Sequence, residues 1–157
     1  AHEALGKDEI PSVRESAMLN PNLPAHMVSK AFASNDSAAL RGIAKRPHLE
    51  KWAKDKLVNN DFSSVQQEVA KRHDLESSHI HSLIDNGDEK VHATIARNTS
   101  IQPEHVDHMI RSAGTEAIKD LAANPAITNR HIRAFSEDPD AEVRANARYN
   151  PKNSMLD

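Results

Sequence analysis

The feature that most constrains this chain is an internal repeat with a period of 26 residues. Small apolar residues open six copies, each 26 residues after the last: Val13, Ala39, Val65, Val91, Ala117 and Val143. Self-similarity at a fixed period over a whole chain is typical of stacked repeat architectures, in which each unit buries its apolar face against its neighbours. The repeat therefore predicts a fold class before any single residue is considered, but it says far less about function.

The first half of each copy predicts a short helix. Val13, Ala17 and Met18 have the spacing of one helix face, and similar triplets recur in the following copies. Residues that can accept hydrogen bonds from the free N–H groups of a helix start stand at the beginning of the later copies: Asp36, Ser63, Asp88, Thr115 and Asp140. Proline after asparagine closes several of these helices, because the residue before proline is driven out of the α region. We expect the asparagines at this point to form turns rather than a binding ladder: Asn20, Asn98, Asn124 and Asn150.

The second half of each copy predicts another helix. In the first copy it runs from about Pro24 to Ala33, with Val28, Ala31 and Phe32 at helical spacing. Because the segment is short, we expect part of it to be 3₁₀. No segment has the alternation of a β-strand. The sequence therefore predicts an all-α solenoid of short paired helices.

The period also predicts the domain organisation. Repeats are expected to start near residues 11, 37, 63, 89, 115 and 141, with the last one incomplete, and residues 1–10 fall on the second helix of a preceding copy. We expect a single repeat domain over residues 1–157 with one core built from neighbour contacts. Neither end has the polar face of a strong capping repeat, so we expect the chain to be a piece of a longer array or protein.

Three stretches of the chain identify a family resemblance. Residues 13–21, 122–125 and 143–151 read VRESAMLNP, AANP and VRANARYNP. They resemble the leucine-rich repeat variant family, whose repeat is similar to VRxxVAxNPxxPxxxLxxLxxDPD. The resemblance covers nearly all of the chain and weakens in copies two to four. It implies two layers of short α and 3₁₀ helices in a right-handed superhelix, related to HEAT arrays.

The resemblance implies an architecture rather than an activity, because functions in the family are diverse. Some members add a cysteine-rich module that holds an iron–sulfur cluster. This chain contains no cysteine, so that cofactor does not carry over.

Composition excludes several classes of function. The lack of cysteine excludes disulfides, thiolate metal sites and cysteine nucleophiles. No apolar run approaches the ~20 residues of a membrane span, and the net charge of −3 gives no overall attraction to nucleic acid. No phosphate loop, nucleophile elbow or paired-carboxylate motif occurs. We therefore expect a cytoplasmic protein that is not an enzyme and has no cofactor.

A group of cations forms the first candidate site. Basic residues recur where the first helices of copies two to four end: Lys45, Arg46, Lys71, Arg72 and Arg97. Stacked helices lie roughly 8–10 Å apart, so these side chains would form a basic ridge that a phosphate backbone could follow. The alternative is that cations favour a helix C-terminus and keep a repeat surface soluble, and this alternative has the larger weight.

Histidines form the second candidate site. His79, His105 and His131 occupy one repeat position, and we expect them to be solvated residues on the flank of the second helices, with a pH-sensitive interface as the functional alternative. One metal ion cannot bridge rungs a full helix spacing apart. His105 and His108 share a helix face near Glu104 and Asp107, but two histidines alone make a weak site, so we expect no bound metal.

Apolar residues in a polar column form the third candidate site. Leu40 and Ile118 stand where other copies have Arg14, Gln66, His92 and Arg144. We expect this column to lie on the exposed side of the first helices, where the two apolar residues mark a protein contact or ordinary surface exposure. The sequence predicts a non-enzymatic scaffold that binds another protein or another part of its own polypeptide. The alternative is a nucleic-acid-binding module that uses the basic ridge.

Overall fold

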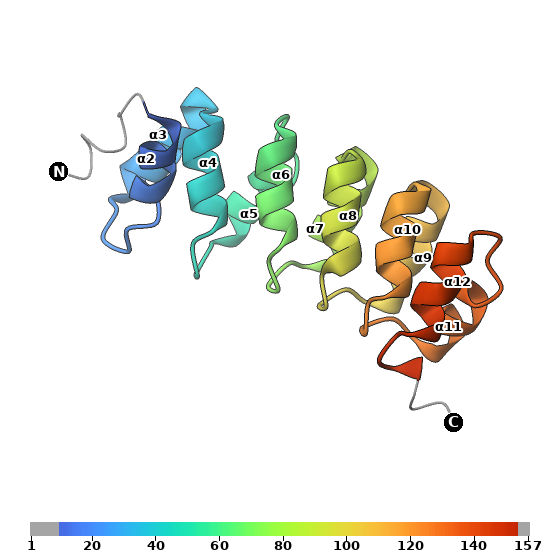
Figure 1. Cartoon of the computed structure of the whole chain (residues 1–157). Coiled ribbons are helices and arrows are strands. Elements are labelled where there is room, and N and C mark those ends of the chain that lie inside the picture. Colours follow the sequence, from blue (N-terminus) through green and yellow to red (C-terminus); the bar gives the residue numbers. More distant parts are fainter. Residues whose placement is uncertain (1–9, 154–157) are drawn as a thin grey trace. The chain divides into compact units, whose positions relative to one another are not determined.

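The structure is a computed structural model that describes residues 10–153. Within this range the chain forms eleven α-helices and no β-strand (Figure 1). The chain divides into two compact units, Ala1–Val69 and Ala70–Asp157. The all-helical prediction is confirmed. The part of the prediction that concerns residues 1–9 lies outside the described residues.

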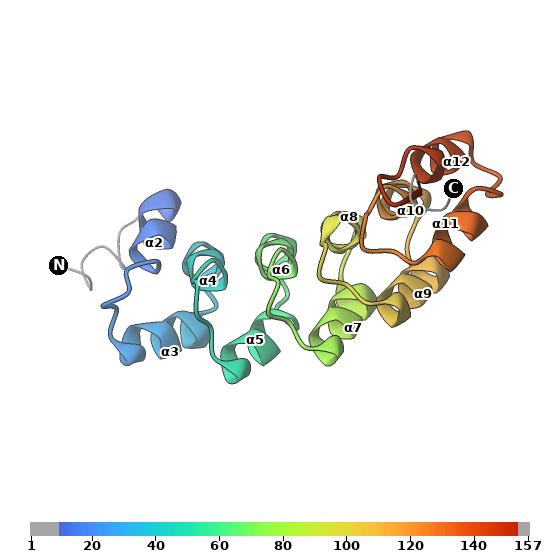
Figure 2. The ribbon, with the colours of Figure 1, turned by 90° about the horizontal axis from the view of Figure 1, so that it is seen from below.

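The first unit consists of two layers of short helices. Its helices are α2 (Pro11–Ala17), α3 (Ala25–Ser34), α4 (Ser37–Ala44), α5 (Lys51–Leu57) and α6 (Ser63–Ala70). In Figure 2, α2, α4 and α6 form one layer, and α3 and α5 form the other. Helix α4 packs against α2 and also contacts α3 and α5.

The second unit has the same two-layer arrangement. Its helices are α7 (Ser77–Asn86), α8 (Glu89–Arg97), α9 (Pro103–Ser112), α10 (Thr115–Ala122), α11 (Asn129–Phe135) and α12 (Ala141–Arg148). Helices α8, α10 and α12 pack side by side in one layer, while α7 and α9 pack in the other, where α11 follows them (Figure 2). None of the helices within residues 10–153 combines the length and the apolar content that crossing a bilayer requires.

Side-chain caps start the first helices of alternate repeats. The carboxylates of Asp36, Asp88 and Asp140 accept hydrogen bonds from backbone N–H groups in the first turns of α4, α8 and α12. The prediction is wrong for Ser63 and Thr115, which are the first helical residues of α6 and α10. A cap residue must precede the helix with extended backbone, and at α10 this position is taken by Gly114.

The second helices are α-helical over all of their bounds, so the expected 3₁₀ segments do not occur there. Bonds of the 3₁₀ type occur at helix ends, both after second helices such as α3 and α5 and where the first helices end. The N–H groups of Asn98 and Asn124 donate to the carbonyls three residues earlier, on Ile95 and Leu121, each at 3.0 Å. This tighter last turn uses carbonyls that a helix end leaves without an α-helical partner.

First and second helices both contribute buried apolar residues to the core. Five of the six repeat openers are buried, and Val13 on α2 is half-buried. Helices α2 and α4 approach closely because Gly42 has no side chain. A Cβ atom there would lie 2.1 Å from the carbonyl oxygen of Glu15 and 2.8 Å from Cβ of Met18. Residue 42 must therefore stay without a side chain for α2 and α4 to keep this packing.

Asparagines link the repeats of the second unit. The side-chain amide of Asn124 donates to the carbonyl oxygens of Ala96 at 2.7 Å and Asn98 at 2.9 Å, which lie 28 and 26 residues earlier. Its Oδ1 accepts the N–H of Ala126 at 2.8 Å. Asn98 and Asn150 make the same three bonds with equivalent partners. The predicted turn is confirmed, and the side-chain amides have a second role, an inter-repeat ladder, that the sequence analysis did not predict.

Candidate functional site

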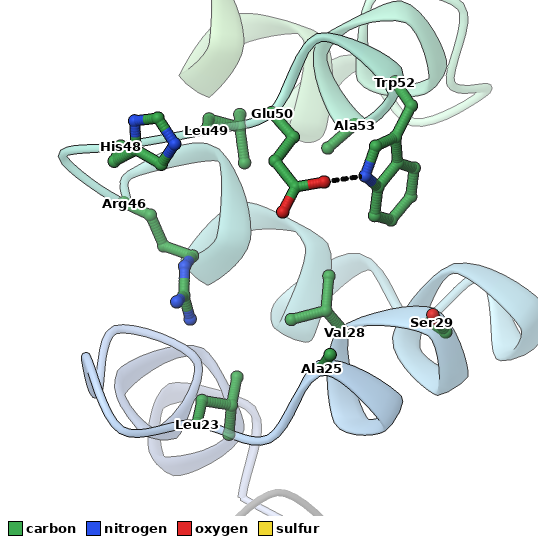
Figure 3. Close-up of a pocket in the computed structure, with 10 residues that line it drawn as sticks. All are labelled: Leu23, Ala25, Val28, Ser29, Arg46, His48, Leu49, Glu50, Trp52 and Ala53. Atoms are coloured by element: carbon green, nitrogen blue, oxygen red, sulfur yellow. Dashed lines mark hydrogen bonds between the residues drawn. The ribbon is translucent and has the colours of Figure 1, made fainter.

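A groove lies between α3 and α5 in the first unit (Figure 3). It has a volume of about 480 Å³. Its lining comes from the start of α3, the loop after α4 and the start of α5: Leu23, Ala25, Val28, Ser29, Arg46, His48, Leu49, Glu50, Trp52 and Ala53. Ligand pockets in proteins typically have volumes of about 300–1,000 Å³, so the groove can hold a few side chains.

The floor of the groove is apolar because it forms between equivalent parts of two repeats. Leu23 and Leu49 stand 26 residues apart at one repeat position, and both are buried. Ala53 is buried beside them, and Val28 is half-buried. The polar atoms of Glu50, His48 and Arg46 lie around this floor (Figure 3). An apolar floor with a polar rim is the usual composition of a site that binds a protein segment.

Trp52 holds a defined position beside the groove. Its side chain is 40% exposed, its Nε1–H donates to the carboxylate of Glu50, and its ring packs against Phe32 with 5.3 Å between the ring centroids. The ammonium of Lys56 lies 5.8 Å from the Phe32 centroid. A tryptophan held on two sides offers a large contact area with little further loss of conformational entropy on binding.

Arg46, a member of the predicted basic ridge, has a structural role. Its guanidinium donates to the carbonyl oxygens of Met18 at 2.8 Å and Asn20 at 3.5 Å. These carbonyls lie 28 and 26 residues earlier, the same separations that the asparagine amides span in the second unit. Arginine thus replaces asparagine as the donor between repeats, and its head group is engaged with the chain itself.

The other ridge residues also have intramolecular partners. Arg72 is only 9% exposed and pairs with both carboxylate oxygens of Asp74, at 2.8 and 2.7 Å. Lys45 lies 2.7 Å from Glu15, and this hydrogen bond raises the pKa of Lys45. Arg97 lies 3.4 Å from Asp120, while Lys71 is exposed. Lys45 and Arg46 belong to the first unit and the other three to the second.

The predicted histidine ladder is buried, so the expectation of solvated side chains is wrong. His79, His105 and His131 are 2%, 1% and 1% exposed. The Nδ1 atoms of His79 and His105 accept the backbone N–H groups of Glu76 and Gln102, the residues that cap α7 and α9. These rings therefore serve as helix caps.

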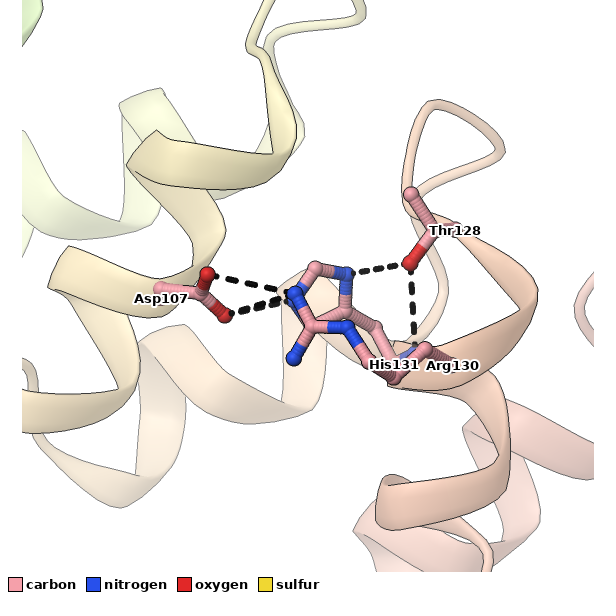
Figure 4. Close-up of polar contacts among 4 residues, drawn as sticks. All are labelled: Asp107, Thr128, Arg130 and His131. Atoms are coloured by element: carbon pink, nitrogen blue, oxygen red, sulfur yellow. Dashed lines mark hydrogen bonds and ion pairs between the residues drawn. The ribbon is translucent and has the colours of Figure 1, made fainter.

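His131 has a similar place at the start of α11 (Figure 4). Its Nδ1 contacts the hydroxyl of Thr128 at 2.7 Å, and its Nε2 lies 2.7 Å from the carboxylate of Asp107 on α9. Arg130 reaches the same carboxylate at 3.2 Å. Hydrogen bonds from His131 and then Arg130 hold the pKa of Asp107 below its usual range. Asp107 therefore links α9 to α11 and is not directed toward His108.

Leu40 is fully buried, at 0% exposed, so it cannot be an exposed contact residue. At the same repeat position Gln66 is buried and His92 is half-buried, whereas Arg144 is exposed. Gln66 donates to the carbonyl of Asn60 at 2.9 Å, and the ring nitrogen Nε2 of His92 lies 2.7 Å from the carbonyl of Ile84. Gln66 and His92 thus satisfy backbone carbonyls at this repeat position, whereas Leu40 occupies it with an apolar side chain. Ile118 is half-buried.

A histidine cluster in the second unit includes a residue that sequence reasoning missed. His81 on α7 lies against His105 and His108 on α9, with ring centroids 4.9 and 4.8 Å apart. Burial lowers the pKa of His105, and His81 adds to the effect. The hydrogen bond from Ser77 lowers the pKa of Glu104. His81, Glu104 and His105 place metal-binding atoms within 4.8 Å of one another.

The sequence signal for His81 was its distance of 27 residues from His108, close to one repeat period.

Comparison of the chain with protein-family models, curated proteins and solved structures gives no match.

Proposed function

We propose that this chain is a non-enzymatic binding scaffold whose partner is a protein, either a separate chain or another part of the same polypeptide. The observation that supports the proposal is the groove between α3 and α5 with Trp52 beside it. Binding energy at protein interfaces concentrates at a few residues, among which tryptophan is enriched, when they stand beside apolar pockets.

The expected ligand is a peptide segment with one apolar anchor residue. The buried floor of Leu23, Leu49 and Ala53 would receive the anchor, and Trp52 would cover it from one side. Polar groups of Glu50 and Ser29 at the edge would bond the peptide backbone. This arrangement gives affinity through burial of apolar surface and orientation through a few hydrogen bonds.

The architecture behind this proposal is a right-handed solenoid of 26-residue repeats resembling the leucine-rich repeat variant family. The matching two-layer arrangement within each unit supports a solenoid. The family, the handedness, the origin of the chain as a piece of a longer array, the absence of catalysis and the cytoplasmic location stay predictions.

Trp52 is the only tryptophan in the chain, so its fluorescence reports directly on the groove. Peptides selected from a random displayed library against the full chain should shift its emission on binding. Two variants test the site: Trp52→Ala removes the aromatic contact, and Ala25→Arg places a long side chain at an exposed lining position. Each should weaken the selected peptides at least about tenfold, since 1.4 kcal/mol is a factor of ten.

Ile110→Ala is the matched control, because Ile110 is also an exposed apolar residue, 44% exposed, but lies on α9 in the second unit. Peptide affinity should be unchanged in this variant. Selected peptides that bind both groove variants as tightly as the original chain would refute the groove as the binding site.

The alternative function is nucleic-acid binding through the ridge cations. It has less support, because Arg46 and Arg72 are engaged within the chain and the net charge is −3. The exposed cations Lys71 and Arg97 offer the fairest test. If the alternative holds, Lys71→Glu with Arg97→Glu should abolish binding of labelled DNA and RNA and flatten its salt dependence. If the original chain binds neither at low salt, the alternative is excluded.

A further inference from the structure

The histidine cluster between α7 and α9 has a bonding pattern that favours a metal ion. We propose that His81, Glu104 and His105 bind one divalent transition-metal ion of the Zn²⁺ class. The three side chains come from two packed helices of the second unit, and their ligand atoms lie within 4.8 Å of one another. The proposal does not depend on the peptide groove, which belongs to the first unit.

When His81 and His108 are both neutral, their hydrogen bonds leave one nitrogen of His81 with a lone pair. The ionised carboxylate of Asp85 can only accept, so Nε2 of His108, 2.7 Å away, carries a proton. In a neutral ring, Nδ1 of His108 is then an acceptor. It lies 2.6 Å from Nδ1 of His81, which must donate. Nε2 of His81 is left with its lone pair.

The same chain of bonds is the support that metal-binding histidines require. A histidine ligand usually donates its second ring N–H to an acceptor, which fixes the ring and raises the basicity of the coordinating nitrogen. In this structure His108 accepts from His81, and Asp85 accepts from His108. His81 is therefore oriented before any ion binds.

Glu104 supplies an anionic oxygen at the edge of the cluster. It is exposed, and its Oε1 accepts the hydroxyl proton of Ser77 at 2.5 Å. The same oxygen lies 3.5 Å from Nε2 of His105. As an exposed side chain, Glu104 can move to bring its oxygen to the 2.0–2.2 Å at which carboxylates bind zinc.

Coordination by His105 breaks an existing hydrogen bond of its ring. Its Nδ1 accepts the N–H of Gln102 at 2.9 Å, so the ring proton is on Nε2, which contacts Ser77 at 2.9 Å. When Nε2 binds the ion, the proton moves to Nδ1, and the bond from Gln102 is lost. The ring stays neutral, and Ser77 keeps Glu104 as its partner. Binding is therefore coupled to the cap of α9.

The donor set indicates the class of ion. Two imidazole nitrogens and one carboxylate are the ligands of many zinc sites, and they leave a position for water. Mg²⁺ and Ca²⁺ prefer sets made of oxygen. Among first-row ions, affinity should rise from Mn²⁺ through Co²⁺ to Cu²⁺.

The test measures Zn²⁺ binding to the full chain by titration calorimetry after chelator treatment. We expect one strong site per chain, visible absorption bands when Co²⁺ replaces Zn²⁺, and no strong Mg²⁺ site. His81→Ala should weaken Zn²⁺ binding by more than about 100-fold. His108→Ala and Asp85→Asn should weaken it about 10–100-fold, the range seen for outer partners of ligands.

His73→Ala is the matched control, because His73 is an exposed histidine of the same unit and contacts Ser100 rather than the cluster. It should bind Zn²⁺ as the original chain does, which separates the site from weak binding to any of the ten histidines. Glu104→Gln alters an exposed side chain and keeps the test valid if His81→Ala fails to fold. Equal Zn²⁺ affinity in Glu104→Gln or in a folded His81→Ala, or no strong site in the original chain, would overturn the proposal.

Discussion

The asparagine ladder predicts a large loss of stability from one substitution, Asn124→Ala. Asn124 is 3% exposed and makes three hydrogen bonds of 2.7 to 2.9 Å, two as a donor to carbonyls of the previous repeat and one as an acceptor within its turn. A typical hydrogen bond contributes about 1 kcal/mol, and a buried group left without a partner costs about 1–3 kcal/mol. Loss of all three should lower the free energy of unfolding by about 2–4 kcal/mol.

A second substitution separates the two roles of this residue. Asn124→Asp keeps the oxygen that accepts from Ala126 but turns an acceptor toward the carbonyls of Ala96 and Asn98. We therefore expect Asn124→Asp to destabilise the chain at least as much as Asn124→Ala. Asn146→Ala is the matched control, because Asn146 is half-buried and makes one inter-repeat bond, 2.9 Å to the carbonyl of Lys119. The Asn146→Ala substitution should lower the free energy of unfolding by about 1 kcal/mol or less.

Urea unfolding followed by far-ultraviolet circular dichroism measures these differences. Hydrogen exchange at the Ala126 amide gives a local measurement, since its protection should fall in Asn124→Ala and persist in Asn146→Ala. A stabilising role of the ladder is refuted if Asn124→Ala costs no more than Asn146→Ala, or if Asn124→Asp is as stable as the original chain.

Four further substitutions at three positions test the packing of the first unit, with Trp52 fluorescence in urea as the measurement. Arg46→Asn introduces the residue that the second unit uses here and should change the free energy of unfolding by less than about 1 kcal/mol. Arg46→Ala should lower it further, because two carbonyls lose their donor. Equal stabilities of these two variants would contradict the structural role of Arg46. Gly42→Ala should cost at least about 2 kcal/mol, because its Cβ meets the Glu15 carbonyl at 2.1 Å; a neutral effect would show that α2 does not pack this closely. Leu40→Ala should cost about 2–5 kcal/mol, as expected for a fully buried leucine, and a cost below about 1 kcal/mol would place Leu40 at the surface.

Local signals in the sequence predicted the local structure well. Apolar spacing gave both helices of the repeat, and Asp36, Asp88 and Asp140 were correctly interpreted as caps. Each of these features depends on residues close together in the chain, where the geometry of one helical turn decides the outcome. The same holds for the turn at Asn124.

Several errors share one physical cause, which is that polar side chains were taken to be at the surface. His105, Arg72 and Gln66 are all wholly or largely buried, and each satisfies polar groups of the chain. Hydropathy and spacing do not distinguish a polar residue in water from one that bonds a buried carbonyl. The difference depends on the neighbouring loop or repeat, which sequence spacing alone does not position.

The histidine cluster shows the same limit. His105 and His108 could be paired from the sequence because they lie three residues apart on one helix. His81 comes from another helix and meets His108 only through the packing of α7 on α9. Side chains that meet across a repeat period need the register of the stack, which is a property of the fold.

The asparagine bonds also limit which insertions and deletions the second unit can tolerate. Asn150 donates to the carbonyl of Asn124, and Asn124 donates to the carbonyl of Asn98. Each of these two successive bonds therefore joins residues that are 26 positions apart. One residue added or removed between two rungs would displace the donor from its acceptor, even if the change fell in an exposed loop. Loops ordinarily accept changes of length, but here the loop length is part of the bonding pattern. Residues outside the ladder can therefore vary while the period remains constant, and natural variation in this unit should change residues far more often than it changes length.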